Sequence, residues 1–137
     1  FANDTALLEA IAAGQCDVGI VNSYYYGRIV KERPEFPVKL FWANQGQGGV
    51  YVNISGAGIV TTSRKPAAAT RFLEWLSAGE AQAHFAAVNM EYPANPAVVV
   101  DPVVKSWGVF EASPINIAEA GRLQSAAVQL MDRAGYR

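Results

Sequence analysis

The stretch "GQCDVGIVNSYYYGRIV", residues 14–30, decides the predicted fold of this chain. Residues 17–21 form a short, continuous segment that is apolar after Asp17 and rich in β-branched side chains, which is typical of a parallel strand buried on both faces. Ser23 is a residue type that caps helices, and the residues after it predict a helix from Tyr24 to about Glu32 that Pro34 ends. A strand that leads into a capped helix is the repeating unit of an open α/β sheet.

The segments on either side of this stretch continue the same pattern. Residues 3–14 predict a short helix that Asn3 or Asp4 can cap and whose apolar stripe consists of Leu7, Leu8 and Ile11. Residues 36–43, "FPVKLFWA", predict a second strand. The order helix, strand, helix, strand favours an α/β fold, in which ligands bind beyond the carboxyl ends of the strands.

The middle of the chain has a different texture. Residues 46–58 are rich in glycine, and alternating side chains in Val50–Ile54 predict a strand within a hinge or a crossing between domains. The glycines match neither a phosphate-binding loop nor a dinucleotide fingerprint, so we do not expect a nucleotide site.

Helices dominate the second half of the sequence. A helical pair is predicted after Pro66, divided at Gly79, with a core stripe of Phe72, Leu73, Leu76, Phe85 and Val88. A loop with three prolines follows. The last helix is predicted to begin after Asn116, with Glu119 completing a capping box and Leu123, Ala127 and Leu130 on one face.

Composition excludes several classes of protein. The chain has 137 residues, half of them hydrophobic, and a net charge of −1 with no basic cluster, so we expect a packed domain that does not bind nucleic acid. No apolar run approaches the roughly 20 residues of a membrane helix. The sequence opens at Phe1 rather than at a methionine, and we expect it to begin inside a longer polypeptide.

The side chains needed for covalent catalysis are scarce. The chain has one cysteine, Cys16, and one histidine, His84. Cys16 precedes an apolar run and is expected to be half-buried, whereas His84 is expected on a helix surface. Because no set of nucleophile, base and orienting group is visible, we expect a binding protein and not an enzyme.

Tyr24, Tyr25 and Tyr26 are the candidate functional residues. Neither a strand nor a helix can point three consecutive side chains to one buried face, so at least one phenol must be exposed or have a polar role. Phenolate is an anionic oxygen donor that suits ferric iron, and a helix N-terminus favours negative charge. Tyrosines also pack at the edges of sheets with a wet hydroxyl, so packing and ligand binding both stay open on the residues alone.

Four segments in register resemble the periplasmic ferric-iron-binding proteins, which are the substrate-binding components of bacterial iron ABC importers. Residues 14–30 are similar to the strand that runs into the family's Asn-x-Tyr-Tyr signature. Residues 50–86 are similar to its return strand and the helix that follows, and residues 90–98, "MEYPANPAV", are similar to its Tyr-Pro-x-Asn-Pro segment. Residues 115–137 are similar to its last helix.

The resemblance implies a type II periplasmic-binding-protein fold, an α/β class in which two lobes close on a ligand through strand hinges. It implies a C-terminal portion with parts of both lobes, since members are about twice this length. Residues 1–45 would belong to the second lobe, residues 46–100 to the hinge crossing and part of the first lobe, and residues 101–137 to helices that return to the second lobe.

The resemblance also implies the site. Tyr24 and Tyr25 match the paired tyrosines that coordinate Fe(III), Asn22 matches a residue near the synergistic anion, and Tyr26 and Arg28 are weaker candidates beside the ligands or the anion. The remaining ligands would come from upstream segments, so this piece alone is expected to bind iron weakly or not at all. It is also expected to expose surfaces through which it can form a dimer.

The implied partner is an ABC transporter permease, and the implied location is the periplasm, or the outer face of the membrane in a Gram-positive cell. The same fold with another ligand, such as thiamine, a polyamine or a phosphonate, stays open, because tyrosines can stack on cations. An effector-binding part of a transcription regulator is a further alternative, which would need a DNA-binding segment outside this sequence.

Overall fold

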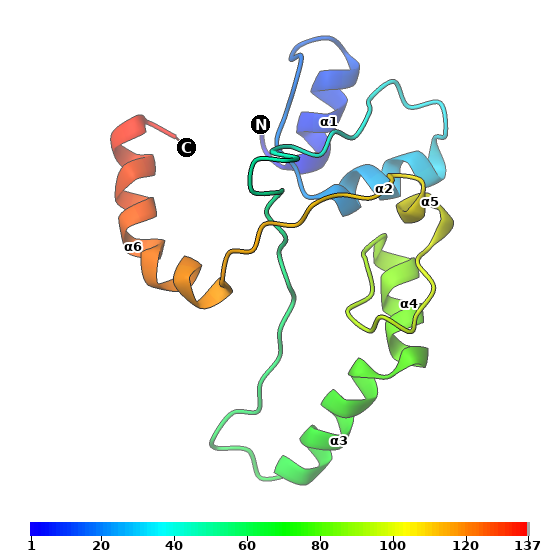
Figure 1. Ribbon diagram of the computed structural model, residues 1–137, viewed down its shortest axis with the longest axis vertical. Coiled ribbons are helices and arrows are strands. Elements are labelled where there is room, and N and C mark those ends of the chain that lie inside the picture. The colour runs from blue at the N-terminus through cyan, green and yellow to red at the C-terminus, as the bar shows by residue number, and fades with distance from the viewer. Residues whose placement is uncertain (137) are drawn as a thin grey trace. The chain divides into compact units, whose positions relative to one another are not determined.

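The computed structural model describes residues 1–136 (Figure 1), and within them it contains helices and extended segments but no ladder of paired strands. The helices are α1 (Asp4–Ala12), α2 (Ser23–Glu32), α3 (Pro66–Ser77), α4 (Gly79–Asn89), α5 (Pro102–Lys105) and α6 (Ile117–Ala134).

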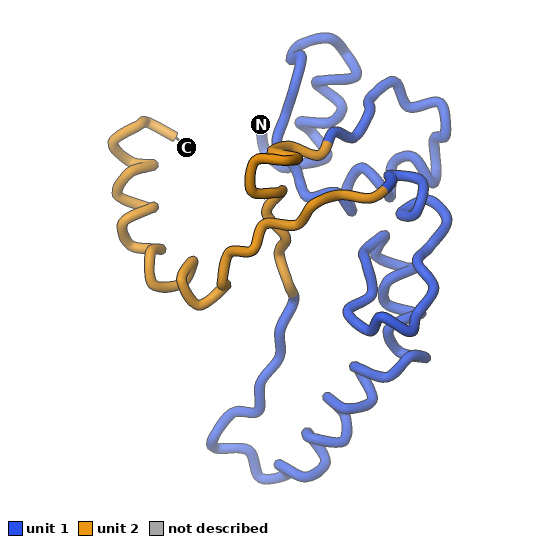
Figure 2. The backbone as a smooth tube through the Cα atoms, viewed as in Figure 1, with its two compact units in different colours: residues 1–41, 55–108 blue, residues 42–54, 109–137 orange. Residues whose placement is uncertain are grey.

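The chain divides into two compact units, coloured separately in Figure 2. Unit 1 consists of Phe1–Phe41 and Ser55–Gly108, and unit 2 consists of Trp42–Ile54 and Val109–Arg137. Each unit is therefore built from two separate stretches of sequence. The predicted assignment of residues 1–45, 46–100 and 101–137 to two lobes stays a prediction.

The core of unit 1 lies between α1 and α2. Leu8 of α1, Ile29 of α2 and Phe36 form a buried cluster, and burial of a Leu or Ile side chain contributes about 1.5–3 kcal/mol. Asn3 caps α1 by accepting a hydrogen bond from the Ala6 backbone N–H at 2.9 Å, as predicted. An ion pair between Glu9 and Arg33 joins the two helices near the end of α2.

Helix α2 also packs closely on the end of α4. A Cβ atom placed on Gly27 would lie 2.7 Å from Cβ of Met90 and 2.9 Å from the ring of Trp107. Met90 is completely buried and takes a left-handed conformation with a φ of 60° after the last turn of α4. Val104 of α5 is also completely buried. Gly27 therefore allows α2 to approach Met90 and Trp107 closely.

The predicted strands are wrong as paired elements within this chain. Residues 17–21, 36–43 and 50–54 belong to no ladder among the described residues, and the extended chain contributes one isolated parallel bridge, between Val50 and Ala112. Strand pairing requires a neighbouring strand, and the described residues supply none beside 17–21.

Side chains in residues 17–21 still alternate as they do in a strand. Gly19 faces α1, because a Cβ atom there would lie 2.9 Å from the side chains of Leu7 and Ile11. Val18 and Ile20 point away from that side and are 85% and 97% exposed. One face of this segment is therefore covered by α1, and the other is covered by no described residue.

The predicted helices are largely confirmed. Pro66 begins α3, Gly79 begins α4, and Asn116 caps α6 by accepting from the Ala118 N–H at 2.9 Å. Glu119 does not complete a capping box but pairs with Arg122 at 2.7 Å. The prediction that the apolar stripes of these helices are buried in a core is wrong for several residues within this chain. The following residues are exposed: Phe72, Phe85, Val88, Leu123, Ala127 and Leu130.

Unit 2 is organised by a glycine-rich turn at residues 44–49. Asn44, Gly46, Gly48 and Gly49 all have positive φ angles there. The side-chain amide of Gln45 donates to the Glu111 carbonyl at 3.2 Å and accepts from the Glu111 N–H at 2.6 Å. This pairing ties the turn to residues 110–113, while its role as a hinge stays a prediction.

Candidate metal centre

The tyrosine pair lies in the first turn of α2. The extended segment 17–21 runs to Asn22, and the helix begins at Ser23. Ser23 is therefore the first helical residue and not the cap, which corrects the prediction. Asn22 holds the cap position, but its side chain makes no capping hydrogen bond to α2. The predicted corner, at the end of an extended segment and the start of a helix, is present, and its role as a ligand site stays a prediction.

Tyr24 and Tyr25 lie against each other. Their ring centroids are 4.6 Å apart and their planes are inclined by 38°. Both side chains are half-buried, and Tyr25 packs against the core cluster of unit 1. Two neighbouring phenols are thus brought to one place, although a regular helix separates successive side chains by about 100°.

The surroundings of Tyr24 favour a protonated phenol in the absence of a cation. Burial raises the pKa of Tyr24 above its usual value near 10, and the hydrogen bond and charge of Tyr25 raise it further. The negative charges of Asp4 and Glu91 act in the same direction. A metal that binds this oxygen must therefore displace a firmly held proton.

Arg28 covers the faces of both rings. Its guanidinium carbon lies 5.2 Å from the Tyr24 ring centroid and 5.6 Å from that of Tyr25, and such contacts contribute about 0.5–1 kcal/mol at exposed sites. The Arg28 guanidinium also donates to Oδ1 of Asn89 at 3.3 Å. The end of α4 thereby holds the positive charge beside the two phenols.

Asn22 is occupied by a contact inside the protein. Its backbone N–H donates to Oδ2 of Asp4 at 2.9 Å, and its side-chain amide donates to the same oxygen at 3.2 Å. Asp4 is the first residue of α1, so this contact joins the starts of α1 and α2.

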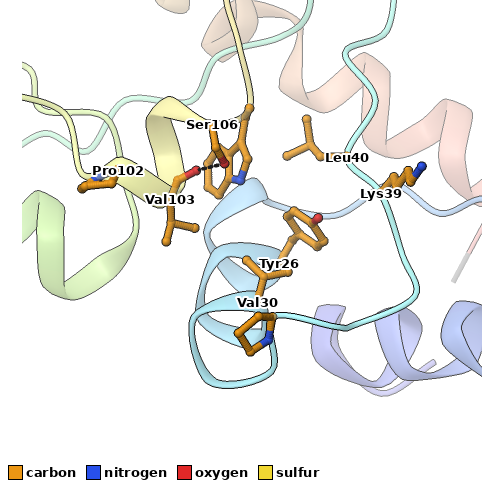
Figure 3. Close-up of a pocket in the computed structure, with 9 residues that line it drawn as sticks. Tyr26, Val30, Lys39, Leu40, Pro102, Val103 and Ser106 are labelled. Atoms are coloured by element: carbon orange, nitrogen blue, oxygen red, sulfur yellow. Dashed lines mark hydrogen bonds between the residues drawn. The ribbon is translucent and has the colours of Figure 1, made fainter.

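Tyr26 is separated from the pair. It lines a pocket of about 600 Å³, shown in Figure 3, in which Tyr26 and Val30 of α2 lie across from Val103 and Ser106. Its ring centroid is 6.2 Å from that of Trp107, and burial raises the pKa of its phenol. Lys39 is the charged residue of this mainly apolar lining. The structure therefore brings Tyr24 and Tyr25 together with Arg28 and Asn22 nearby, and directs Tyr26 elsewhere.

The donor set in this chain is small. Residues 1–136 contain no group of three or more His, Cys, Asp or Glu side chains that could hold a metal ion. Cys16 is half-buried and His84 is exposed on α4, as expected, and His84 lies beside Phe85. The two phenols are oxygen donors at the corner, and the carboxylate of Asp4 lies beside Asn22.

The sequence reasoning missed the residues that support this corner. Asn89, Met90 and Asp4 contact α2 or its cap from sequence positions far from the tyrosines, and no local pattern marks them. The short helix α5 was also missed. Its signal is present in the sequence, because Asp101 is a capping residue followed by Pro102 and accepts from the Val103 N–H at 2.8 Å.

A family model described as bacterial extracellular solute-binding protein matches residues 1–83. This chain belongs to that family. Membership confirms the expectation of a solute-binding protein with an extracytoplasmic location. Among residues 1–136, none of the helices combines the length and the apolar character that a membrane crossing requires.

Two named relatives are similar to almost the whole of this chain. The chain is 42% identical to iron uptake protein A2 of Synechocystis over 98% of its own length and 41% of the relative's length. It is 27% identical to the major ferric iron-binding protein of Neisseria meningitidis over 100% of its own length and 42% of that protein. The chain thus spans less than half the length of these relatives.

A solved structure agrees in fold. A Trichodesmium protein, IdiA (FutA), in complex with iron and citrate, superposes with a TM-score of 0.92 at 39% identity. The match covers 100% of this chain and 45% of the other. The predicted fold class, part of a type II periplasmic binding protein, is confirmed by this similarity, even though the described residues form no ladder of their own.

Proposed function

We propose that the protein carrying this chain is the substrate-binding component of an ABC importer that binds ferric iron through the phenolates of Tyr24 and Tyr25. The observation that carries the proposal is the pair of phenols at the start of α2, 4.6 Å apart between ring centroids. It is supported by relatives named for iron uptake and ferric iron binding.

The chemistry of the pair fits a hard, highly charged cation. Fe(III) displaces the phenol protons and gains two anionic oxygen donors, as metals do when they deprotonate bound thiols or water. Arg28 stabilises the resulting negative charge from 5.2 and 5.6 Å above the ring centroids. The dipole of α2, whose N-terminal end lies at this corner, acts in the same direction.

Two phenolates leave most of an octahedral coordination sphere open. We infer that the remaining ligands come from a polypeptide as long as the relatives and from a synergistic anion near Asn22. The 137-residue chain alone is then expected to bind Fe(III) weakly. Release to a membrane permease follows when the two sources of ligands separate.

The test uses a protein of the relatives' length that contains this sequence. Addition of Fe(III) should produce a visible phenolate-to-iron charge-transfer band, and the double variant Tyr24→Phe/Tyr25→Phe should lack it. Tyr26→Phe is the matched control, because Tyr26 faces the pocket beside Trp107 and should leave the band unchanged. A double variant that keeps the wild-type band would contradict the assignment.

Cationic organic ligands are disfavoured by Arg28. Thiamine or a polyamine would stack on the tyrosine faces, but a guanidinium already lies over both rings. A phosphonate would instead meet Arg28 and the start of α2. Calorimetric titration with Fe(III), thiamine, spermidine and 2-aminoethylphosphonate separates these ligands. The relatives' names support binding rather than catalysis.

A further inference from the structure

Asp4 holds the residue that leads into the tyrosine pair. Its Oδ2 accepts from the backbone N–H of Asn22 at 2.9 Å and from the Asn22 side-chain amide at 3.2 Å. These are the donors that an external anion would use if it were bound by Asn22. Asp4 itself is half-buried and belongs to the first turn of α1, which Asn3 caps.

We propose that Asp4 is a positioning residue for the tyrosine pair and that its carboxylate is an internal hydrogen-bond acceptor, which an external anion must displace from Asn22. This inference rests on the proposed binding of Fe(III) by Tyr24 and Tyr25. It assigns Asp4 no direct contact with the metal.

The contacts between α1 and α2 allow Asp4 to influence the orientation of α2. Helix α1 contacts α2 at three places along its length: Asp4 holds Asn22 before the first turn, Leu8 packs on Ile29 in the middle, and Glu9 pairs with Arg33 after the last turn. Contacts at both ends and at the centre fix the rotation of α2 about its own axis. That rotation determines where the phenol oxygens of the first turn point.

The competition follows from the donors of Asn22. One carboxylate oxygen takes the backbone N–H and one of the two side-chain N–H groups, so a citrate or phosphate oxygen that uses the same two donors must displace Asp4. Asp4→Ala removes the acceptor and leaves both donors free for an anion. Asp4→Asn retains an acceptor oxygen of similar reach and removes only the charge, so it separates hydrogen bonding from electrostatics.

The experiment measures Fe(III) affinity by the charge-transfer band in the longer protein, with and without citrate. Asp4→Ala should weaken binding about tenfold without citrate, in the range of outer partners of metal ligands, and saturating citrate should restore most of the loss. Asp4→Asn should stay near the wild-type affinity without citrate. Asp17→Ala, which removes an exposed carboxylate from the segment before Asn22, is the control and should match wild type.

Equal affinities for wild type and Asp4→Ala in both conditions would overturn the inference. A double-mutant cycle of Asp4→Ala and Asn22→Ala on urea unfolding tests the contact between the two side chains without iron, since Asn22→Ala keeps the backbone N–H. Coupling of at least about twofold in the unfolding constant supports it, and additive effects overturn it. A wild-type protein without the band, together with clear coupling, would refute the proposed function and the role of Asp4 toward the metal while retaining the contact.

Discussion

Gly27 is the residue at which packing and the site are most tightly linked. An added Cβ atom would lie 2.7 Å from Cβ of Met90 and 2.9 Å from the Trp107 ring, and neither neighbour is the flexible end of a side chain. We expect Gly27→Ala to lower the free energy of unfolding by about 1–3 kcal/mol, because overpacking costs more than the gain in helix propensity. Urea denaturation measures the change.

Gly121 offers a matched control for this substitution. It also lies inside a helix, but nothing is within 4 Å of a Cβ atom placed there. Gly121→Ala should raise the stability of α6 by up to about 1 kcal/mol through helix propensity alone. A Gly27→Ala protein as stable as wild type would show that the contact between α2 and Met90 is not formed.

The proton on Tyr24 sets the direction of a pH dependence. Because the pKa of Tyr24 is raised by burial and by its neighbours, the phenol is protonated at neutral pH, and iron that binds it as proposed must replace that proton. Below that pKa, each phenol that loses a proton on binding lowers the apparent Fe(III) affinity about tenfold per unit fall in pH. Chelator competition between pH 8 and pH 6 measures this slope.

The slope can be assigned by substitution. Tyr24→Phe should reduce the number of protons released by one and flatten the dependence accordingly, in addition to weakening binding. An Fe(III) affinity that does not change with pH would mean that the iron ligands are not phenols.

Among the elements, α1 depends on its cap. Asn3 accepts from the Ala6 N–H at 2.9 Å, and α1 carries Leu8 into the core and Asp4 to Asn22. Asn3→Ala should therefore lower the free energy of unfolding by about 1 kcal/mol, whereas Asn3→Asp retains the acceptor and should cost much less. Equal losses in the two variants, measured by thermal or urea unfolding, would show that the side-chain bond contributes nothing.

Helices could be predicted from the sequence because their signals are local. Asn3 and Asn116 mark helix starts, and Pro66 occupies a first turn, and all three predictions are confirmed. The strands could not be confirmed in this way, since pairing depends on segments distant in sequence. The candidate site also combines local and distant signals. The tyrosine corner could be predicted from a local pattern, whereas Asn89 and Asp4 reach it only through tertiary packing.

At the scale of the whole molecule, exposed apolar side chains in residues 17–21 mark a face that no described residue covers. Gly19 packs on α1 while Val18 and Ile20 are 85% and 97% exposed on the other face. A run of this composition is typical of a strand buried on both faces. The chain spans 41% of one relative and 45% of one solved neighbour, so a protein of their length has ample residues to cover that face.

Ile20→Ala tests this interpretation by comparing two lengths of chain. In the 137-residue chain Ile20 is almost fully exposed, so the substitution should change the free energy of unfolding by less than about 0.5 kcal/mol. In a protein of the relatives' length the same substitution should cost about 2–5 kcal/mol, as it does for a buried isoleucine. Val21→Ala is the control, because Val21 packs on the core of unit 1 and should destabilise both proteins. A small effect of Ile20→Ala at both lengths would mean that this face stays open in the longer protein, and that residues 17–21 are not a strand buried on both faces.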